Sequence, residues 1–294
     1  MPAVSYVVVA FHRPAALATL LATASADDIE VIVVNVEADP EVARVTAAAD
    51  ARCIDLEDNV GYAAAVNAGV AVARADTVLF SNDDLVASAG DVTALAAVVR
   101  SGACGVAVPK IVDGEGRHEL SIAALPTVGA LAREWLALPD RPVLFLAKRL
   151  TVQKWRAPDS PSVVDAATAA FVAVDRSVIT DVPLPEAYFL YWEESDWFWR
   201  LRQRGVVVEY RPDIVVQHSG GRDDVRSDKT RLLATNAVRC VRRTQGRLRA
   251  LVAVPVVIAW NLRLLLIAVV RRRHVGARWA GLTAAITSVR EVWT

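Results

Sequence analysis

Three continuous apolar runs, rich in β-branched residues, place the strongest constraint on the fold of this chain. The runs are Val4–Ala10, Ile29–Val34 and Thr77–Phe80. Strands that are apolar at successive positions, and not only at alternate ones, are typical of parallel sheets buried on both faces. Helix-like stretches lie between them, at Pro14–Thr23, Pro40–Ala49 and Gly61–Arg74. We therefore predict an α/β fold that begins with a βαβαβ, Rossmann-like nucleotide-binding half.

The residues directly after each run are the first candidates for ligand binding, because ligands of open α/β sheets bind beyond the carboxyl ends of the strands. They are Phe11, His12 and Arg13 after the first run, Asn35, Val36 and Glu37 after the second, and Ser81, Asn82, Asp83 and Asp84 after the third. We expect these side chains to meet at one edge of the sheet.

The sequence Asn82-Asp83-Asp84 is a candidate metal site. Its two carboxylates and its amide follow a buried strand, and a hard divalent cation such as Mg²⁺ or Mn²⁺ prefers oxygen ligands of this kind. Such a cation keeps coordination positions open for diphosphate oxygens. The alternative is that the three residues form a turn or a helix cap, in which Asn and Asp are also common.

A second acidic group lies in the segment Tyr188–Arg200, where Glu193, Glu194 and Asp196 stand among seven aromatic residues. Burial among rings raises the pKa of a carboxylate towards that of a useful general base. If a helix begins at Glu193, Asp196 and Arg200 are four residues apart and can pair on one side of it. The alternative is an acidic helix N-terminus, stabilised by the helix dipole, over an aromatic core.

Two further features admit both a functional and a structural interpretation. Asn59, Gly61, Asn67 and Gly69 surround the start of an alanine-rich helix, where small residues let a ligand approach. Equally, Asn59 can be an N-cap and Gly61 a turn residue. His218 ends an apolar strand and precedes Ser219-Gly220-Gly221, so it can bind a metal or a diphosphate, or be structural.

Charge and cysteine content exclude several classes of protein. Thirty-three lysine and arginine residues balance 33 aspartate and glutamate residues, which removes the basic field of a protein that binds nucleic acid through its phosphates. Cys53, Cys104 and Cys240 form no CxxC pair, so neither a disulfide framework nor a zinc cluster is indicated. The apolar run at the start is too short for a signal peptide and no basic segment precedes it. A reducing compartment fits best.

The C-terminal part predicts contact with a membrane. An arginine-rich helical stretch, Val225–Arg249, leads to the apolar segment Leu251–Val270 and then to three successive arginines. The segment approaches the ~20 apolar residues that cross a bilayer. It is interrupted by Pro255, Asn261 and Arg263. We expect it to lie in the interface, as a peripheral or monotopic anchor, ahead of a partner-binding helix in a homo-oligomer and of a tilted spanning helix.

The order and spacing of these features resemble those of the family 2 glycosyltransferases of the GT-A fold, and in particular their rhamnosyltransferase-like branch. The resemblance covers about Val4 to Gly221. It is carried by the end of the first run (Ala10-Phe11-His12-Arg13), a loop with Asn59, Gly61, Asn67 and Gly69, the metal motif Asn82-Asp83-Asp84, the acceptor signature Glu193-Glu194-Ser195-Asp196 with Arg200, and the late His218.

This resemblance implies a GT-A fold with a mixed central sheet and C-terminal apolar helices. It implies a glycosyltransferase domain over residues 1–224, with a nucleotide-sugar half at 1–112 and an acceptor half at 113–224, followed by a membrane-associated helical region at 225–294. The middle of the chain, Asp113–Pro161, has no clean period and predicts loops with one helix. Further strands are expected within Val163–Val174, at Val206–Tyr210 and at Ile214–His218.

The resemblance also implies roles for single residues. Asp84 would be the main ligand of Mg²⁺ or Mn²⁺, with Asn82, Asp83 and His218 beside it. Glu194 would be the catalytic base of an inverting displacement, oriented by Asp196 and Arg200, with Glu193 as the rival base. The donor-binding residues would be Phe11, His12, Arg13, Asn35, Glu37, Asn59, Gly61, Asn67, Asn82 and Asp83.

The implied reaction transfers rhamnose from dTDP-rhamnose to a lipid-linked glycan at the cytoplasmic face of the cell membrane, in cell-envelope polysaccharide synthesis. Two positions depart from the family pattern. Asn35 replaces an aspartate that accepts a hydrogen bond from the pyrimidine, and an asparagine carbonyl can accept the same bond. Glu194 replaces an aspartate and is one methylene longer. Two alternatives remain, a galactofuranosyl- or hexosyltransferase that uses a UDP-sugar, and a non-catalytic membrane-bound assembly subunit.

Overall fold

The computed structural model describes residues 2–119, 121–123, 125, 127–129, 131, 158–219 and 226–293. Contacts divide the chain into two compact units. The first, called the sheet unit here, comprises Met1–Ala123, Ala157–Phe189 and Arg200–Gly220. The second, the helical unit, comprises Ala124–Arg156, Leu190–Trp199 and Gly221–Thr294. The acidic segment Leu190–Trp199 therefore belongs with the C-terminal helices, whereas the sequence alone assigned it to residues 1–224. The helix expected within Asp113–Pro161 falls mostly outside the described residues.

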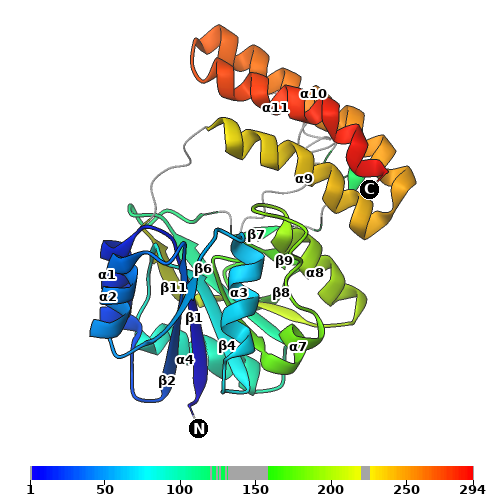
Figure 1. The fold of residues 1–294 in the computed structure, drawn as a ribbon. Coiled ribbons are helices and arrows are strands. Elements are labelled where there is room, and N and C mark those ends of the chain that lie inside the picture. Colours follow the sequence, from blue (N-terminus) through cyan, green and yellow to red (C-terminus); the bar gives the residue numbers. More distant parts are fainter. Residues whose placement is uncertain are drawn as a thin grey trace. The chain divides into compact units, whose positions relative to one another are not determined.

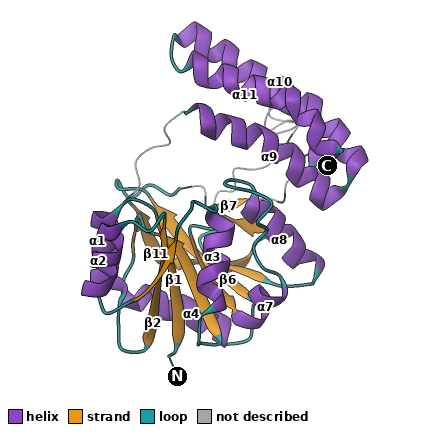
Figure 2. Cartoon of the chain, in the orientation of Figure 1, coloured by secondary structure: helices purple, strands orange, loops and turns teal. Residues whose placement is uncertain are grey.

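A mixed nine-stranded sheet forms the sheet unit, in the order β3-β2-β1-β4-β10-β6-β11-β5 with β8 beside β11 (Figures 1 and 2). Its strands are β1 (Val4–Ala10), β2 (Ile29–Val36), β3 (Arg52–Leu56), β4 (Thr77–Asn82), β5 (Leu85–Val86), β6 (Val106–Val112), β8 (Ser162–Val163), β10 (Phe171–Asp175) and β11 (Val208–His218). Strands β3, β2, β1 and β4 are parallel to one another, whereas β10 is antiparallel to both β4 and β6. A second, small sheet pairs β7 (Ile122–Ala123) with β9 (Ala166–Ala167).

The three apolar runs are all strands, and β2 and β4 each extend two residues further than expected. The helices of this unit are α1 (Pro14–Ala24), α2 (Pro40–Ala48), α3 (Tyr62–Ala71), α4 (Ala89–Arg100) and α7 (Arg176–Asp181). Two expectations were wrong. Strand β3 was missed because it is a largely exposed edge strand of mixed polarity. The strands expected at Val206–Tyr210 and Ile214–His218 are the single strand β11, whose register shifts between Arg211 and Val215, where Pro212 cannot donate to the ladder.

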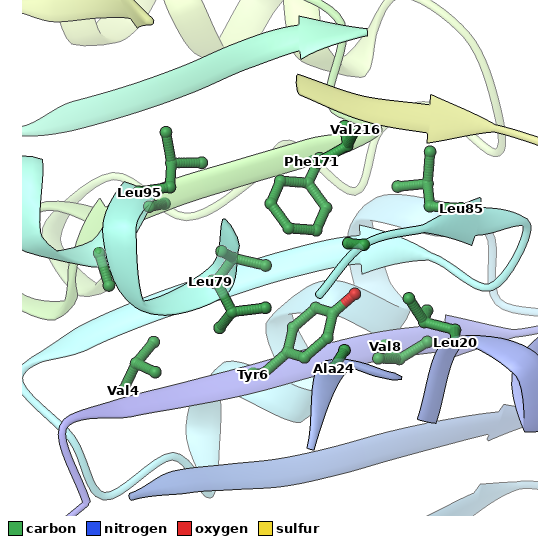
Figure 3. Close-up of a cluster of buried hydrophobic side chains, with 14 of the residues drawn as sticks. Val4, Tyr6, Val8, Leu20, Ala24, Leu79, Leu85, Leu95, Phe171 and Val216 are labelled. Carbon is green, nitrogen blue, oxygen red and sulfur yellow. The ribbon is translucent and has the colours of Figure 1, made fainter. Parts of the chain in front are cut away.

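Apolar side chains fill both faces of the parallel strands, as continuous runs require. On one face Tyr6 and Val8 of β1 and Leu79 of β4 pack with Leu20 of α1 and Phe171 of β10 (Figure 3). On the other face α3 lies so close to β1 that a Cβ at Gly69 would come within 2.3 Å of Val7. Gly69 is thus explained by the packing of a helix on the sheet.

Gly61 begins α3 with a left-handed backbone, φ +85°. A Cβ added there would lie 2.2 Å from the carbonyl oxygen of Phe189, whose oxygen also accepts a hydrogen bond from Tyr62 N at 3.2 Å. Asn59 is not the N-cap that one interpretation assigned. Its side-chain oxygen accepts from Gly61 N at 3.2 Å instead, and so forms the turn that precedes the helix.

Replacing Gly61 by alanine is expected to lower the free energy of unfolding by roughly 2–4 kcal/mol, because both the backbone conformation and the close approach to Phe189 resist a Cβ. Gly102→Ala is the matched control, since Gly102 also has a positive φ, +77°, but nothing lies within 4 Å of its Cβ position. Its loss should be about 1 kcal/mol. Urea unfolding followed by circular dichroism compares the two, and equal losses would contradict the role of the Phe189 contact.

Three helices and a short 3₁₀ helix dominate the described part of the helical unit: α9 (Ser227–Gln245), α10 (Arg247–Arg271), α11 (Val275–Thr287) and η2 (Ser288–Val292). The helix expected over Val225–Arg249 is divided at Gly246, which has φ +89°. Alanine and valine side chains form its core, including Ala237 and Val241 of α9 and Ala253 and Val257 of α10. These small residues allow the helices to approach closely.

Helix α10 contains the whole apolar segment, with Pro255 inside it. By length and composition it is able to cross a membrane, with a mean hydropathy of 2.2 over its most apolar window, and 39% of that window is buried within the structure. One face is therefore buried, through Val257, Asn261 and Leu265, while Leu262, Leu266 and other large apolar residues of α10 are exposed. A buried core helix passes the same test of length and composition, so this finding does not choose between interface and span.

Candidate functional site

Residues from three distant segments meet at the carboxyl edge of the sheet, around Asp83 and Asp84. The backbone N–H of Phe11, just after β1, donates to Asp83 Oδ2 at 3.0 Å. The guanidinium of Arg13 contacts Asp84 Oδ2, and His218 Nε2 lies 3.2 Å from Asp84 Oδ1. The residues after β1 and β4, which the sequence marked as candidates for ligand binding, therefore lie together with His218, and their role in binding stays a prediction.

The backbone carbonyl of Asp84 fixes the turn in which this residue lies. Asp84 follows β4 and precedes β5, and its carbonyl oxygen accepts hydrogen bonds from both the N–H and the hydroxyl of Ser219, each at 2.8 Å. Ser219 comes directly after His218, so the pairing of β5 with β11 sets the histidine and the carboxylate against each other. A turn, the structural alternative for these residues, is thus present together with the acidic cluster.

The pKa values of the two carboxyls are shifted in opposite directions. Burial raises the pKa of Asp83 to about 6, against the lowering effect of the Phe11 N–H. Burial also raises the pKa of Asp84, but His218 and Arg13 together lower it more, so that Asp84 is the more acidic of the pair. The pKa of His218 is raised to about 9, and the largest cause is its hydrogen bond to Asp84.

Glu119 is a member of this cluster that sequence reasoning missed. Its Oε2 lies 3.0 Å from His218 Nδ1, so the imidazole stands between two carboxylates. Glu119 lies in the stretch that was expected to be irregular, 99 residues before the histidine. No local motif marks it. The bridge between Val112 and His118, together with the bond from Glu119 N to the Ile111 carbonyl at 2.9 Å, holds this segment against the end of β6.

Asp84 is a suitable ligand for a divalent cation. Its Oδ1 is buried and accepts no hydrogen bond of standard geometry from the described residues, and its charge favours a hard cation. Among the described residues, no group of three or more His, Cys, Asp or Glu side chains is arranged to hold a metal ion. The donor set therefore fits a cation that is completed by substrate phosphates and water, as Mg²⁺ usually is in proteins.

His12 and Glu37, both predicted to bind the donor, lie together beside this cluster of segments. His12 Nε2 is 2.7 Å from Glu37 Oε2, and its Nδ1 is 2.9 Å from Asp39 Oδ2. These carboxylates, Glu37 first, raise the pKa of His12. His12, Glu37 and Ala38 all have left-handed backbones, with φ of 53°, 64° and 47°. Left-handed non-glycine residues cost about 1–3 kcal/mol each and concentrate at binding sites.

Asn35 has a different environment from the one that the family pattern implied. The residue is fully buried, and its side-chain oxygen accepts the N–H of Asp39 at 3.0 Å. Its Nδ2 donates to the Asp39 carbonyl at 3.0 Å and to Asp55 Oδ1 at 2.7 Å. The exposed carboxylate in this region is therefore Asp55 at the end of β3, a residue that sequence reasoning missed together with its strand.

Asn67 connects α3 to the segment that follows α7. Its Nδ2 donates to the Leu184 carbonyl at 2.9 Å and to Glu186 Oε1 at 2.8 Å, and its oxygen accepts from Leu184 N at 3.1 Å. These bonds give Asn67 a structural function, and its predicted role in donor binding stays a prediction.

The predicted helix over the acidic segment is confirmed as α8 (Glu193–Gln203). Glu193 and Asp196 are buried, with 4% and 1% exposure, and Glu194 is half-buried. Burial, and then the charge of Glu194, raises the pKa of Glu193 to about 8. Burial likewise raises the pKa of Glu194. Both shifts are in the direction that makes a carboxylate a stronger general base.

Asp196 pairs with Arg243 of α9, whose Nε donates to Asp196 Oδ2 at 2.8 Å. The spacing along α8 would also allow Asp196 to pair with Arg200, whose Nη2 donates to the Pro183 carbonyl at 2.7 Å. Arg243 was missed because it lies outside the family motif, 47 residues from Asp196. The backbone just before α8 is strained, because Tyr191 and Trp192 have left-handed φ values of 69° and 77° although neither is glycine.

Glu193 is expected to make stability fall as the pH rises. Its pKa is raised on folding, so the protonated native carboxyl loses its advantage between the ordinary value of 4.5 and about 8. Over that window the free energy of unfolding should fall by up to about 1.4 kcal/mol per pH unit. Glu193→Gln removes the titrating group and should flatten this decline. Thermal unfolding at pH 5 to 9 measures it, with Glu115→Gln, an exposed site, as the control; parallel curves for wild type and Glu193→Gln would contradict it.

Asp84 and His218 belong to the sheet unit, whereas Glu193, Glu194 and Asp196 belong to the helical unit. Their predicted convergence on one sugar stays a prediction. A cavity of about 980 Å³ in the sheet unit lies among the residues that precede the parallel strands, including Asp28, Arg52 and Arg74. It is therefore at the other end of these strands from Asp84.

The sequence and the fold of this chain were each compared with those of known proteins. Residues 5–136 match the sequence model of glycosyl transferase family 2, and a search of curated proteins gave no match. Three similar solved structures establish the fold as GT-A, as expected. The mannosyltransferase PcManGT from Pyrobaculum calidifontis in complex with GDP-Man and Mn²⁺ is 12% identical, with a TM-score of 0.56 over 98% of this chain and 87% of that one.

The other two structures are similar to the same degree. S. aureus TarS 1-349 is 12% identical, with a TM-score of 0.54 over 99% of this chain and 90% of that one. GalNAc-T7 with UDP, GalNAc and Mn²⁺ is 16% identical, with a TM-score of 0.55 over 81% of this chain and 47% of that one. At these identities the three structures show the fold alone.

Proposed function

We propose that this chain is a family 2 glycosyltransferase that uses a nucleoside-diphosphate sugar and a divalent cation. The observation that carries the proposal is the cluster of Arg13, Asp83, Asp84 and His218 at the carboxyl edge of a GT-A sheet, where the buried Asp84 Oδ1 lies 3.2 Å from His218 Nε2 and accepts no hydrogen bond of standard geometry from the described residues. Two of the similar structures, by their descriptions, contain a nucleotide or nucleotide sugar with Mn²⁺, which supports the same ligands here.

In this proposal Asp84 is the main cation ligand, with His218, Asn82 and Asp83 next to it. When bound, Mg²⁺ or Mn²⁺ neutralises the negative charge that develops on the departing diphosphate. The guanidinium of Arg13 and the N–H of Phe11 supply positive charge and a hydrogen bond at the same edge. His12, Glu37 and Asp55 lie at the ends of β1, β2 and β3 and form the nucleoside side of the site, together with the glycine-containing turn at Asn59 and Gly61.

Glu194 is the proposed base. It removes the proton of an acceptor hydroxyl while that oxygen forms the bond to the anomeric carbon and the bond to the nucleoside diphosphate breaks, so the configuration inverts. Asp196 and Arg200, on the same helix, position it. Glu193 is the rival, because burial raises its pKa as well. The raised pKa of Glu194 supports the assignment, since a carboxylate with an ordinary pKa is a weaker base.

The proposed donor is dTDP-rhamnose and the proposed acceptor a lipid-linked glycan, on the strength of the rhamnosyltransferase-like motifs. Incubation with a panel of nucleotide sugars and Mn²⁺ or Mg²⁺, with and without lipid-linked acceptor, tests both. Release of dTDP from dTDP-rhamnose that depends on acceptor supports the proposal. Turnover of UDP-galactofuranose or a UDP-hexose instead identifies the alternative donor class. If no donor is turned over, the result would favour a non-catalytic assembly subunit.

Helices α10 and α11 form the proposed membrane-binding surface. Between residues 247 and 294 there are eight arginines and one acidic residue. Large exposed apolar residues accompany them, among which Leu266, Val270, Trp279 and Trp293 are 58%, 83%, 59% and 64% exposed. Tryptophan and arginine beside aliphatic residues are typical of helices that lie in the interface of an anionic bilayer. Such a surface would bring the enzyme to a lipid-linked acceptor at the cytoplasmic face.

Reversing the charge of Arg271, Arg272 and Arg273 to glutamate is expected to weaken binding to phosphatidylglycerol vesicles by ~100-fold or more, since each arginine near an anionic surface contributes ~1 kcal/mol. Vesicle sedimentation measures it. The matched control reverses three exposed arginines of the sheet unit, Arg44, Arg100 and Arg204. Equal weakening in both variants would contradict a localised surface, and a dimer in solution with no vesicle binding would favour the homo-oligomer.

A further inference from the structure

The acidic segment of α8 is held by side chains of the C-terminal helix α9. We propose that Asn236 and Arg243 of α9 are positioning residues that set the orientation of Glu193 and Glu194 for sugar transfer. The C-terminal helical region would then position active-site residues in addition to providing a membrane-binding surface. This inference rests on the glycosyltransferase function proposed above, and all of its contacts lie within the helical unit.

Asn236 holds the backbone just before α8. The residue is buried, with 1% exposure, and its Nδ2 donates to the Leu190 carbonyl at 2.9 Å and to the Tyr191 carbonyl at 3.2 Å. These two peptide groups flank Tyr191, which has a left-handed backbone, as does Trp192 after it. Two successive left-handed residues that are not glycine persist only where their surroundings enforce them. A single carboxamide that donates to both carbonyls is such a constraint.

Further bonds from the same helix strengthen this hold. The indole Nε1 of Trp192 donates to the Leu233 carbonyl of α9 at 3.1 Å. The ammonium of Lys229, one turn earlier, lies 5.5 Å from the centre of the Tyr191 ring, within the range of a cation–π contact. Helix α9 thus contacts the backbone or side chain of each residue from Leu190 to Trp192, the three residues that lead into Glu193.

Arg243 holds the first turn of α8 from the other side. Its Nε donates to Asp196 Oδ2 at 2.8 Å, and the Asp196 side chain is 2% exposed. The N–H of Asp196 donates to the Trp192 carbonyl at 3.1 Å. Glu193 and Glu194 therefore lie in a short stretch that is bonded to α9 at both ends, through Asn236 before it and Arg243 after it. The Asp196 carboxylate is the buried end of this ion pair, whereas Arg243 is 43% exposed, so displacement of the helix would leave a buried charge without its partner.

The carboxamide of Asn236 is itself oriented from the end of the chain. Its Oδ1 accepts from Arg239 Nη1 at 3.2 Å, and Arg239 Nε donates to Glu291 Oε2 of η2 at 2.8 Å. The acceptor role of Oδ1 directs Nδ2 towards the Leu190 and Tyr191 carbonyls. The network therefore runs from η2 through α9 to the Leu190 and Tyr191 carbonyls, just before the proposed base. This explains why a C-terminal helix carries a buried asparagine in an otherwise alanine- and valine-rich core.

The test compares Asn236→Ala, Arg243→Ala and Arg243→Lys with the matched control Arg242→Ala, in the full chain. Arg242 is the adjacent arginine of α9 and donates to the Val292 carbonyl. With the donor that the wild type uses, Asn236→Ala and Arg243→Ala should lower kcat roughly 10- to 100-fold, since small displacements of a reacting group have this effect. The KM for donor should stay within about two-fold. Arg243→Lys should recover part of the rate, and Arg242→Ala should match the wild type.

Hydrogen exchange of the peptide that covers residues 188–199 keeps the inference testable without turnover. Asn236→Ala and Arg243→Ala should speed exchange there while the thermal unfolding midpoint stays close to that of Arg242→Ala. Folded variants with wild-type kcat and wild-type exchange would overturn the inference. A parallel loss of donor affinity and fold would also overturn it, since it would indicate a structural role alone. If the wild type turns over no nucleotide sugar but the exchange result holds, the proposed function fails and the positioning contacts stand.

Discussion

Replacing Asp84 by asparagine is expected to lower the rate of sugar transfer by roughly 10³-fold, because a cation that neutralises a leaving diphosphate contributes several kcal/mol to the transition state. The asparagine keeps the shape of the side chain, but its neutral oxygen is a weaker ligand, and it leaves Arg13 and His218 without the negative charge that they contact. The affinity for Mn²⁺ in the presence of nucleoside diphosphate should fall with the rate. Initial rates over a range of Mn²⁺ concentrations, with Mn²⁺ binding followed by electron paramagnetic resonance, measure both.

Asp76→Asn is the control for this variant, since Asp76 precedes β4, at the opposite end from Asp84, and its side chain is 91% exposed. It should retain wild-type rate and Mn²⁺ affinity. An Asp84→Asn protein that folds, binds Mn²⁺ as the wild type does and keeps its rate would remove Asp84 from the site. Addition of a metal chelator should stop turnover by the wild type, and turnover that persists at full rate would show that the reaction needs no cation.

Replacing Glu194 by glutamine is expected to lower kcat by roughly 10²–10⁴-fold while leaving the affinity for the nucleotide sugar unchanged, because the variant loses the proton acceptor and little else. The amide is isosteric with the carboxyl and cannot take the proton of the acceptor hydroxyl. Single-turnover transfer and calorimetric binding of the donor separate the two effects. The pH–rate profile of the wild type should also have its lower limb above the ordinary glutamate pKa, in the direction to which burial shifts Glu194.

Glu193→Gln is the matched variant, since it changes the adjacent carboxyl by the same single atom. If Glu194 is the base, Glu193→Gln keeps most of the rate and changes mainly the pH dependence of stability. The reverse result, with full activity in Glu194→Gln and loss in Glu193→Gln, would assign the base to Glu193. Loss of donor binding in Glu194→Gln would contradict a role limited to proton transfer.

The sequence by itself determined the central strands and the place of the metal motif. A strand buried on both faces must be apolar at every position, so β1, β2 and β4 are visible in the chain as continuous runs. The topology of open α/β sheets then directs attention to the residues after those runs, and Phe11, Arg13 and Asp84 do meet there. The helix start at Glu193, which the sequence analysis considered as a condition, is present as α8, where acidic residues favour the helix N-terminus.

Only the tertiary structure decided which partner each polar group has. Strand β3 carries no apolar run because it is an exposed edge, so both the strand and the bond of Asp55 to the buried Asn35 escaped detection. Glu119 reaches His218 across 99 residues, and Arg243 reaches Asp196 across 47. The hydrophobic pattern of a segment indicates which of its residues face the core. A hydrogen bond between two distant segments depends instead on how the whole chain folds. For that reason the acidic motif and the arginine-rich helix were both visible in the sequence, and the contacts between them were not.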